Sequence, residues 1–466
     1  MRSFQAACLL LSASFAAACE RSVDATIALR PDSTYQTIVG WEAVTQSGEA
    51  EIAEFPLYKD ALFDSAVNWL GINRLRLEAY AGIENSRDYW NERLSGQIDN
   101  QRWLCARFET ENDDDDPDHI EWSNYHFSQM DYTVERVVLP IKRLLEARGE
   151  TLYLNVNYDA FVLRCPGTPY HHLDDLDEYA EFALATFLHL RDTFGLVPDA
   201  WEMILEPDNT NWRGPAIGEA MVRTGRLLAE HGFHPDFIAP SNTEMAAAVR
   251  YFDEIVRVPG ALDYLDEISY HRYRGPQRED VEAIGERAAR YGLRSAMLEH
   301  IGSGHEDLYE DLAIGRNSAW QQFALAYGGR NAARNQENDR GGVYFPIDIS
   351  DPERPRILVG RRTHYLRQTF RFVRAGARRI GAGSTDGRHQ PLAFVNRDAG
   401  TVVVVKSDAP GELDIIGLPA GRYAVTYTTE KERGAMLPAI ALAAGDTLRA
   451  RIPAAGVLTA HPDTMR

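Results

Sequence analysis

The stretch Asp199–Pro207, DAWEMILEP, is a short apolar run that ends in a glutamate and a proline. Seven further runs of this kind lie along residues 34–377, separated by patterns of helical period. Short apolar runs that alternate with amphipathic segments are typical of repeated βα units. Eight such units over this length predict an α/β fold, a (β/α)8 TIM barrel.

The eight predicted strands and five of the predicted helices have the following places in the chain. The strands are Tyr35–Trp41, Gly71–Tyr80, Thr151–Asp159, Asp199–Pro207, Asp236–Asn242, Asp266–Tyr273, Arg294–His300 and Gly341–Ile347. The helices are Tyr132–Arg148, Leu176–Phe194, Ala216–His231, Arg278–Tyr291 and Asn317–Tyr327.

The character of the sequence changes after the eighth run. Residues 378–466 contain short alternating or β-branched runs such as GTVVVVKS and GRYAVTYTT, punctuated by Gly, Asp and Pro. This pattern predicts a small antiparallel β-sandwich on the C-terminal side of the barrel. The early run at residues 24–33 has no place among the barrel strands, and we expect it to pair into this sandwich.

The first nineteen residues read as a signal peptide: one arginine, a short apolar stretch and then small residues that end at Cys19. The Ala-Ala-Ala-Cys ending also resembles a bacterial lipobox, which would leave Cys19 lipidated as the first mature residue. Plain secretion and a lipid anchor at Cys19 both stay open. In either case we expect a secreted, periplasmic or cell-surface protein.

The composition of the chain limits the classes of molecule that it is expected to bind. With 44% hydrophobic residues, the 466-residue chain has enough apolar surface for a real core. Its formal net charge of −20 argues against nucleic acid and against electrostatic binding to an anionic membrane, since both reward clustered Lys and Arg. A membrane would be reached only through the anchor at Cys19. The sequence leaves the oligomeric state open.

A long polar and aromatic insertion follows the second predicted strand, between Tyr80 and Tyr132. Insertions of this kind on barrel enzymes usually shape the substrate cleft. Cys105 in the insertion and Cys165 after the third strand fall on neighbouring loops, so they are candidates for a disulfide, with two buried thiols as the alternative. The acidic run Asp113–Asp116 lacks the alternating spacing of calcium loops, so we expect a solvated acidic loop.

Catalytic groups in a (β/α)8 barrel sit at the carboxyl ends of the strands. Glu206 follows strand four and Glu299 ends strand seven, and these two strands face each other across the barrel. A pair of converging carboxylates is what glycoside hydrolysis requires, at about 5 to 5.5 Å in retaining enzymes. Clustered histidines lack a metal-binding layout, so we expect no catalytic metal and no cofactor.

Several stretches resemble the clan A glycoside hydrolases, and glycoside hydrolase family 30 most closely. Tyr35–Ala43, YQTIVGWEA, is similar to the opening of that family, and Ser269–Gly275, SYHRYRG, is similar to its strand-six His-x-Tyr. His364–Asp386, followed by Leu392–Ser407, resembles the family's passage into its side β-sandwich.

The resemblance implies a retaining glycosidase that acts on an oligo- or polysaccharide. Glu206 would be the acid/base and Glu299 the nucleophile. Arg76, or Arg74, would keep the nucleophile ionised, while the acid has a raised pKa. Two further residues carry implied roles: His271 would line the sugar site, and Tyr273 would donate a hydrogen bond to the nucleophile.

Other positions suggest sugar contacts or depart from the family. Tyr158 and Trp212 are candidates for stacking on a sugar face. Glu42 and Glu78 would add carboxylates at the barrel mouth. Leu205 stands where the family has an asparagine that binds the sugar 2-hydroxyl, which puts the sugar specificity in doubt. Two alternatives remain: a non-catalytic glycan-binding surface lipoprotein, and a transglycosylase or inverting hydrolase in which Glu42 or Glu78 takes part.

Overall fold

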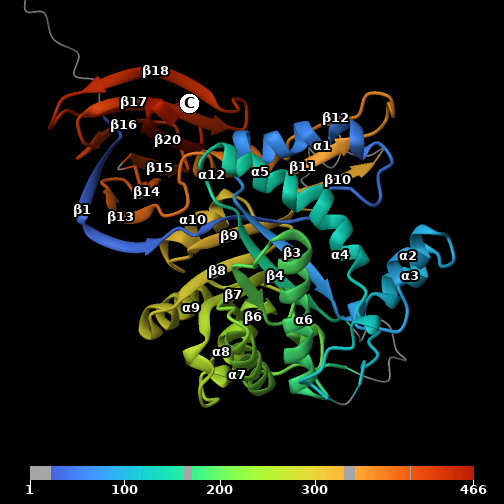
Figure 1. Ribbon diagram of the computed structural model, residues 1–466. Coiled ribbons are helices and arrows are strands. Elements are labelled where there is room, and N and C mark those ends of the chain that lie inside the picture. Colours follow the sequence, from blue (N-terminus) through green and yellow to red (C-terminus); the bar gives the residue numbers. More distant parts are fainter. Residues whose placement is uncertain (1–22, 115, 162–170, 330–341, 399, 466) are drawn as a thin grey trace, which may run out of the picture.

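A closed parallel barrel forms the larger part of the molecule (Figure 1). The computed structural model describes residues 23–114, 116–161, 171–329, 342–398 and 400–465. The barrel strands are β2 (Gly40–Val44), β3 (Arg74–Tyr80), β4 (Tyr153–Asp159), β5 (Ala200–Glu202), β6 (Asp236–Glu244), β7 (Leu265–Tyr273), β8 (Arg294–Glu299) and β9 (Ala319–Ala324). The predicted TIM barrel is therefore confirmed.

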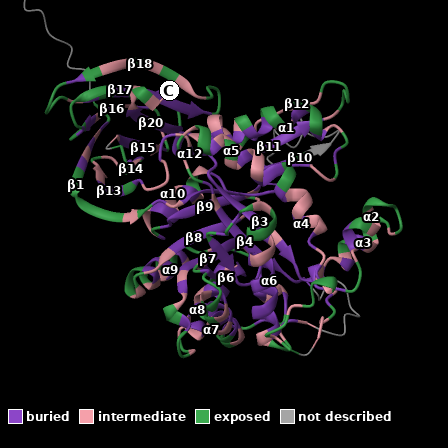
Figure 2. Ribbon diagram, viewed as in Figure 1, coloured by how far each residue is buried: buried purple, intermediate pink, exposed green. Residues whose placement is uncertain are grey.

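Helices follow the strands and cover the outside of the barrel. They are α1 (Phe55–Asp64), α4 (Ser128–Thr133), α5 (Leu139–Ala147), α6 (Leu176–Phe194), α7 (Gly214–Glu230), α8 (Met245–Ile255), α9 (Arg278–Tyr291), α10 (His305–Ala313) and α12 (Arg361–Phe370). Single π-helical turns extend α1 and join α4 to α5. The barrel strands between them are almost completely buried (Figure 2).

Local sequence explains where these helices begin and end, as α6 illustrates. The Asp175 side chain accepts a hydrogen bond from the Asp177 N–H and so caps the first turn. Asp177 and Glu178 place negative charge at the helix N-terminus, where the helix dipole favours it. Gly195 ends the helix with a φ of 65°, in the left-handed region that glycine adopts without strain.

The eighth barrel strand is not the one that the sequence predicts. It is β9, which lies inside the range Asn317–Tyr327 that was expected to be a helix. The run predicted as strand eight, Gly341–Ile347, instead contributes to β11 (Phe345–Asp348). That strand lies outside the barrel, between β10 (Ala326–Gly329) and β12 (Arg356–Ile357) in a three-stranded sheet.

The insertion after β3 folds into two short helices, α2 (Tyr89–Leu94) and α3 (Asn100–Ala106), beside α4 (Figure 1). Asp88 caps α2 and Asp99 caps α3, each by accepting a backbone N–H three residues on. Cys105 on α3 is disulfide-bonded. Cys165 lies outside the described residues, so its pairing with Cys105 stays a prediction.

The second domain is a nine-stranded, mostly antiparallel sheet. Its order is β18 (Ala435–Leu442), β17 (Gly421–Thr429), β20 (Gly456–Pro462), β15 (Thr401–Ser407), β14 (His389–Val395), β13 (Arg378–Ser384), β1 (Ala25–Thr37), β16 (Gly411–Ile416) and β19 (Leu448–Ile452). Apolar side chains from both halves of the sheet form one core, as a β-sandwich requires. The early run joins this sheet as β1, which continues past the predicted boundary at residue 33.

Helix α12 joins the two domains. Its Gln368 is completely buried. The Gln368 amide donates to Thr428 Oγ1 at 2.9 Å and accepts from the Thr426 hydroxyl at 2.8 Å. On the barrel side, Phe370 stacks on Trp41 with ring centroids 4.5 Å apart. One helix therefore ties the floor of the barrel to the sheet through both polar and apolar contacts.

The N-terminal residues 1–22 lie outside the described residues, so the signal peptide and the anchor at Cys19 stay predictions. Across the described ranges, none of the helices is long and apolar enough to span a bilayer.

Candidate active site

Glu206 lies beyond the end of β5 in an unusual backbone conformation. Its φ of 48° places it in the left-handed region, which is sparsely populated for residues with a side chain and is often found at functional sites. Its carboxylate is bound twice: Oε1 lies 3.0 Å from His271 Nδ1, and Oε2 accepts a hydrogen bond from Asn209 Nδ2 at 2.8 Å. The carboxylate is thus fixed from two sides.

Glu299 is the last residue of β8, and two side chains hold its carboxylate. Arg76 Nη2 donates to Oε2 at 2.5 Å, and the Tyr273 hydroxyl donates to Oε1 at 3.1 Å. Arg76 is completely buried and also donates to the Leu298 carbonyl. Each of the two Glu299 carboxylate oxygens therefore has a donor from another barrel strand.

The two glutamates face each other at close range. Side-chain atoms of Glu206, His271 and Glu299 all lie within 4.8 Å of one another. Such a set includes metal-ligand types, but Arg76 already forms an ion pair with Glu299, and His271 contacts Glu206. One oxygen of Glu206 and one of Glu299 are therefore close enough to act on the same bound group.

Glu206 and His271 form a coupled pair. Burial opposes ionisation of Glu206, but the hydrogen bond and the charge of His271 outweigh it and lower the Glu206 pKa. Burial likewise opposes the charge of His271, whereas its contacts with Glu206 and Glu299 raise the His271 pKa above the usual 6.5. The direction for Glu206 is therefore opposite to the raised pKa expected of the acid, because its contact with His271 outweighs burial.

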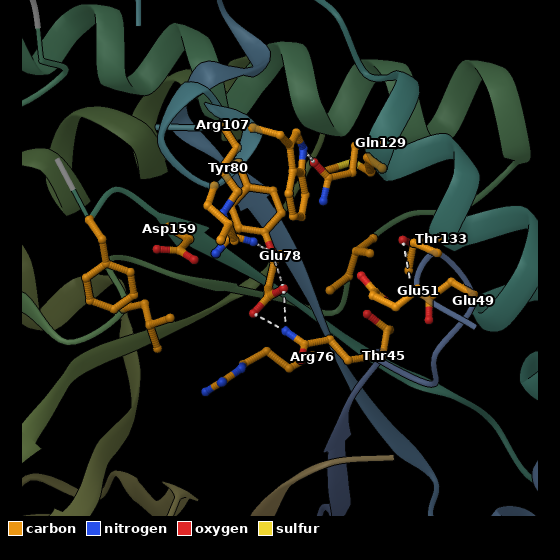
Figure 3. A pocket seen from close by; sticks show the side chains of 18 of the residues that line it. Thr45, Glu49, Glu51, Arg76, Glu78, Tyr80, Arg107, Gln129, Thr133 and Asp159 are labelled. Atoms are coloured by element: carbon orange, nitrogen blue, oxygen red, sulfur yellow. Dashed lines mark hydrogen bonds between the residues drawn. The ribbon is translucent and has the colours of Figure 1, made fainter. Parts of the chain in front are cut away.

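Glu206 and Glu299 both line a cavity of about 540 Å³. Figure 3 shows other residues of its lining, among them Arg76 and Glu78. Arg76, Glu78, Leu205, Glu206 and Glu299 contribute to its floor and walls, and the insertion supplies Trp90 and Trp103. The Glu78 carboxylate accepts hydrogen bonds from Gln46 Nε2 at 3.1 Å and from the Tyr80 hydroxyl at 2.5 Å. The insertion thus shapes one wall of the cavity.

The cavity carries far more negative than positive charge. Its ionisable lining comprises the carboxylates of Glu49, Glu51, Glu78, Asp159, Glu206 and Glu299 and the guanidinium groups of Arg76 and Arg107. Burial raises the pKa of Glu49 to about 7. Figure 3 places Glu49 and Glu51 on one side of Glu78 and Asp159 on the other. The negative surplus is therefore spread around the cavity and is not confined to Glu206 and Glu299.

Next to Glu206 the wall is apolar. Leu205 is 5% exposed and packs with Tyr80, Phe108 and Phe161 in one cluster. A leucine side chain has no hydrogen-bonding group, whereas an asparagine side chain could bind a hydroxyl. This part of the wall therefore offers only apolar contact.

Five predicted site residues are not among those that line the cavity. Glu42 is completely buried and forms an ion pair with Arg74, which also binds Glu267 at 2.7 Å, so it does not lie at the mouth. The other four are also absent from the lining: Tyr158 contacts His172, Trp212 packs against Tyr179, His271 contacts Glu206, and the Tyr273 hydroxyl donates to Glu299.

The sequence reasoning missed several residues of this site. Asn209, which donates to Glu206, lies three residues after that glutamate. Pro207 predicts a turn, and such a turn could have indicated that Asn209 folds back onto Glu206. Glu49 and Arg107 come from loops that no strand pattern marks. Tyr327, whose hydroxyl donates to Gln46, lies on β10, which was predicted as helix.

No family model and no curated protein matches the chain. Solved structures do match. An endoxylanase of glycoside hydrolase family 30 from Clostridium papyrosolvens C71 is 17% identical, covering 94% of this chain and 99% of its own, with a TM-score of 0.64. The catalytic domain of the family 30 xylanase C from Talaromyces cellulolyticus is 14% identical, covering 94% and 99%, with a TM-score of 0.66.

An endo-β-1,6-glucanase is 15% identical, covering 94% of this chain and 95% of its own, with a TM-score of 0.62. The chain thus resembles clan A glycoside hydrolases, and family 30 in particular, over nearly its whole length. At these identities the likeness is one of fold.

Proposed function

We propose that this chain is a retaining glycoside hydrolase. In the first step Glu206 delivers the proton of its pair to the leaving oxygen while Glu299 attacks the anomeric carbon, giving a covalent glycosyl-enzyme. In the second step Glu206 takes a proton from water, which attacks that carbon and releases Glu299. No cofactor enters either step.

One observation carries this proposal: two carboxylates lie within 4.8 Å of each other on the floor of a cavity, and their partners differ. Glu299 is bound by a buried guanidinium, which suits a nucleophile that must be ionised. Glu206 is bound by a histidine with a raised pKa, which suits a group that must receive and return a proton.

The substrate that fits best is a neutral, β-linked oligo- or polysaccharide. Structural neighbours include an endoxylanase and an endo-β-1,6-glucanase, two enzymes for different glycans, so fold alone does not select the sugar. The surplus of carboxylates repels a sugar acid. Trp90 and Trp103 in the wall offer aromatic surface to a sugar ring. A secreted, periplasmic or cell-surface site of action, as the N-terminal sequence suggests, suits such a polymer.

A glycan-binding surface lipoprotein is the second candidate, and Leu205 favours it because the wall beside Glu206 cannot bind the sugar 2-hydroxyl. An inverting reaction is less well supported, because Glu42 is buried in an ion pair and Glu206 and Glu299 leave little room for a water between them. Glu78 does line the cavity, so its substitution belongs in the test.

The test is release of reducing ends from neutral polysaccharides, among them xylan and β-1,6-glucan, with polygalacturonate as an acidic comparison. We expect the wild type to cleave a neutral polymer and to leave the acidic one intact. Glu206→Gln should lower turnover about 10²- to 10⁴-fold, as expected for loss of a general acid. Glu299→Gln should abolish turnover.

Glu219→Gln, an exposed glutamate on α7, is the matched control and should keep wild-type turnover. Wild-type turnover in Glu299→Gln would refute the assignment of the nucleophile. Binding of the polymers without any release of reducing ends, unchanged in Glu206→Gln, would instead support the glycan-binding protein.

A further inference from the structure

A second group of carboxylates lies away from the cavity, between the insertion and α6. Asp113 comes from the acidic loop that follows α3, and Glu178 and Glu181 come from the first turns of α6. One oxygen from each of the three lies within 4.8 Å of the others. Side chains three residues apart share one face of a helix, so Glu178 and Glu181 point toward the loop together.

Hydrogen bonds hold Asp113 in place opposite α6. Its backbone N–H donates to Glu84 Oε1 at 3.1 Å. Its own carboxylate oxygens accept the backbone N–H groups of Asp114 at 2.9 Å and Glu121 at 2.7 Å. The loop is therefore built to present a carboxylate at this point, although its negative charge faces two further carboxylates.

The two glutamates lack the partners that buried carboxylates normally have. Glu181 is 0% exposed; its Oε1 accepts from the Tyr125 hydroxyl at 3.1 Å, but no donor in the described ranges reaches Oε2. Glu178 is 3% exposed and forms no hydrogen bond or ion pair with any described residue. Buried ionised groups are normally paired or bound to a metal, because an isolated buried charge is very costly.

Further carboxylates surround Asp113, Glu178 and Glu181, and nearby basic side chains do not offset their negative charge. Glu84, Asp114 and Asp175 also face the group and add negative charge. The nearest basic side chains contact other carboxylates: His172 Nε2 lies 2.5 Å from Glu84, and His119 Nδ1 lies 2.7 Å from Asp114. Within the described ranges, no lysine or arginine forms an ion pair with any of the three.

The geometry points to a Ca²⁺ site formed by Asp113, Glu178 and Glu181. Ca²⁺ takes six to eight oxygen ligands at about 2.3 to 2.6 Å, so oxygens on opposite sides of the ion lie roughly 4.6 to 5.2 Å apart. The three oxygens lie within 4.8 Å of one another, close enough to contact one ion. A set made only of carboxylates also favours Ca²⁺ over zinc, which prefers thiolate and imidazole.

Protonation is the alternative to a cation. Burial, with the neighbouring carboxylates, raises the pKa of Glu178 to about 8 and that of Glu181 to about 9. Without a cation the two glutamates therefore stay largely protonated at neutral pH. The two states differ in a measurable way, because only the ion-binding site responds to added Ca²⁺.

The expected solvated acidic loop is thus reinterpreted. The run Asp113–Asp116 supplies only one of the three carboxylates, and the other two come from a helix more than sixty residues away along the chain. No local spacing could have indicated such a site. Its role would be to clamp the insertion, whose α3 lines the cavity, onto the barrel.

The test uses the full chain, stripped with a chelator and then titrated with CaCl₂ by calorimetry and by thermal unfolding. We expect the wild type to bind one Ca²⁺ and its Tm to rise by on the order of a few degrees at saturation. Glu178→Gln and Glu181→Gln should each weaken binding by about tenfold or more. Asp118→Asn, an exposed residue on the same loop, should bind as the wild type does.

Misfolding of the variants is separable from loss of the site. In chelator at neutral pH the two glutamates are largely protonated, so each glutamine replaces a neutral group of similar shape and the two variants should unfold near the wild-type Tm. A stripped wild type that takes up no Ca²⁺ and shows no change in Tm would overturn the proposal. Ca²⁺ binding of wild-type strength in both glutamine variants would overturn it as well.

Discussion

At the residue scale, the pair of Glu206 and His271 controls the proposed proton transfer. Glu206 Oε1 lies 3.0 Å from His271 Nδ1, so we expect the two side chains to share one proton and the raised pKa of His271 to govern when that proton is lost. A hydrogen bond between two titrating groups makes their titration a property of the pair. The basic limb of the pH profile should therefore report the pair and not Glu206 alone.

His271→Asn should move the basic limb of the kcat/KM profile to lower pH. In the wild type the reactive proton is lost at the His271 pKa, which lies above 6.5. Without the imidazole, Glu206 must hold the proton itself. Burial raises the Glu206 pKa, but from the usual glutamate value of 4.5 and not from the histidine value of 6.5. The measurement is kcat/KM from pH 4 to about pH 9, which reports groups of the free enzyme.

His231→Asn, an exposed histidine at the end of α7, serves as the control and should leave the profile unchanged. If the basic limb of His271→Asn stays in place or moves to higher pH, the proton is not shared with His271 and the pair does not act as a unit.

The sequence predicted part of the site because strand ends are recognisable. Glu206 and Glu299 end apolar runs, and in the structure they meet at one cavity. Glu42 and Trp212 were wrongly predicted to contact the sugar, because a residue type alone does not show how deeply its side chain is buried. Glu42 lies in the middle of β2, beside Arg74, and the Trp212 ring is 3% exposed, packed beneath the loop it follows.

At the element scale, the entry into β3 positions Arg76. Gly71 ends the π-helical turn with a φ of 108° and leads directly into the strand. A Cβ at Gly71 would collide with the carbonyl oxygen of Phe370 at the end of α12. The close approach of two elements, and not only the turn, therefore demands glycine here.

Gly71→Ala should lower the free energy of unfolding by more than the ordinary cost of a left-handed alanine. That cost is about 1 to 2 kcal/mol, and overpacking against backbone adds roughly 1 to 3 kcal/mol. Gly149→Ala is the matched control, since Gly149 has a φ of 72° but open space around it. Urea unfolding of both variants gives the comparison, and equal losses would show that contact with Phe370 contributes nothing.

The assignment of the eighth strand shows where periodicity fails. β9 contains Gln321 and Gln322, so it does not read as an apolar strand. Both glutamines are buried, and their amides donate to the carbonyls of Leu298 and Ser303, which a barrel interior supplies and a sequence pattern does not reveal. The run at Gly341–Ile347 is more apolar than β9 and does contain strand residues. These residues pair with β10 in the three-stranded sheet and not in the barrel.

At the scale of the whole molecule, the chain combines a common scaffold with a local modification. The barrel, the side sheet and their link through α12 account for the likeness to family 30 enzymes over nearly the full length. The insertion after β3 and a surplus of carboxylates line the cavity. The scaffold was predictable from the alternation of elements, whereas the cavity was not, because its lining comes from loops.

The stereochemistry of the first-formed product tests the central proposal most directly. NMR spectroscopy of a neutral β-linked substrate during cleavage follows the anomeric proton before mutarotation mixes the two forms. Double displacement through Glu299 inverts the anomeric carbon twice, so the account predicts that the first product has the β configuration of the substrate. Release of the α-anomer first would mean a single displacement by water, and it would contradict the assignment of Glu299 as a nucleophile.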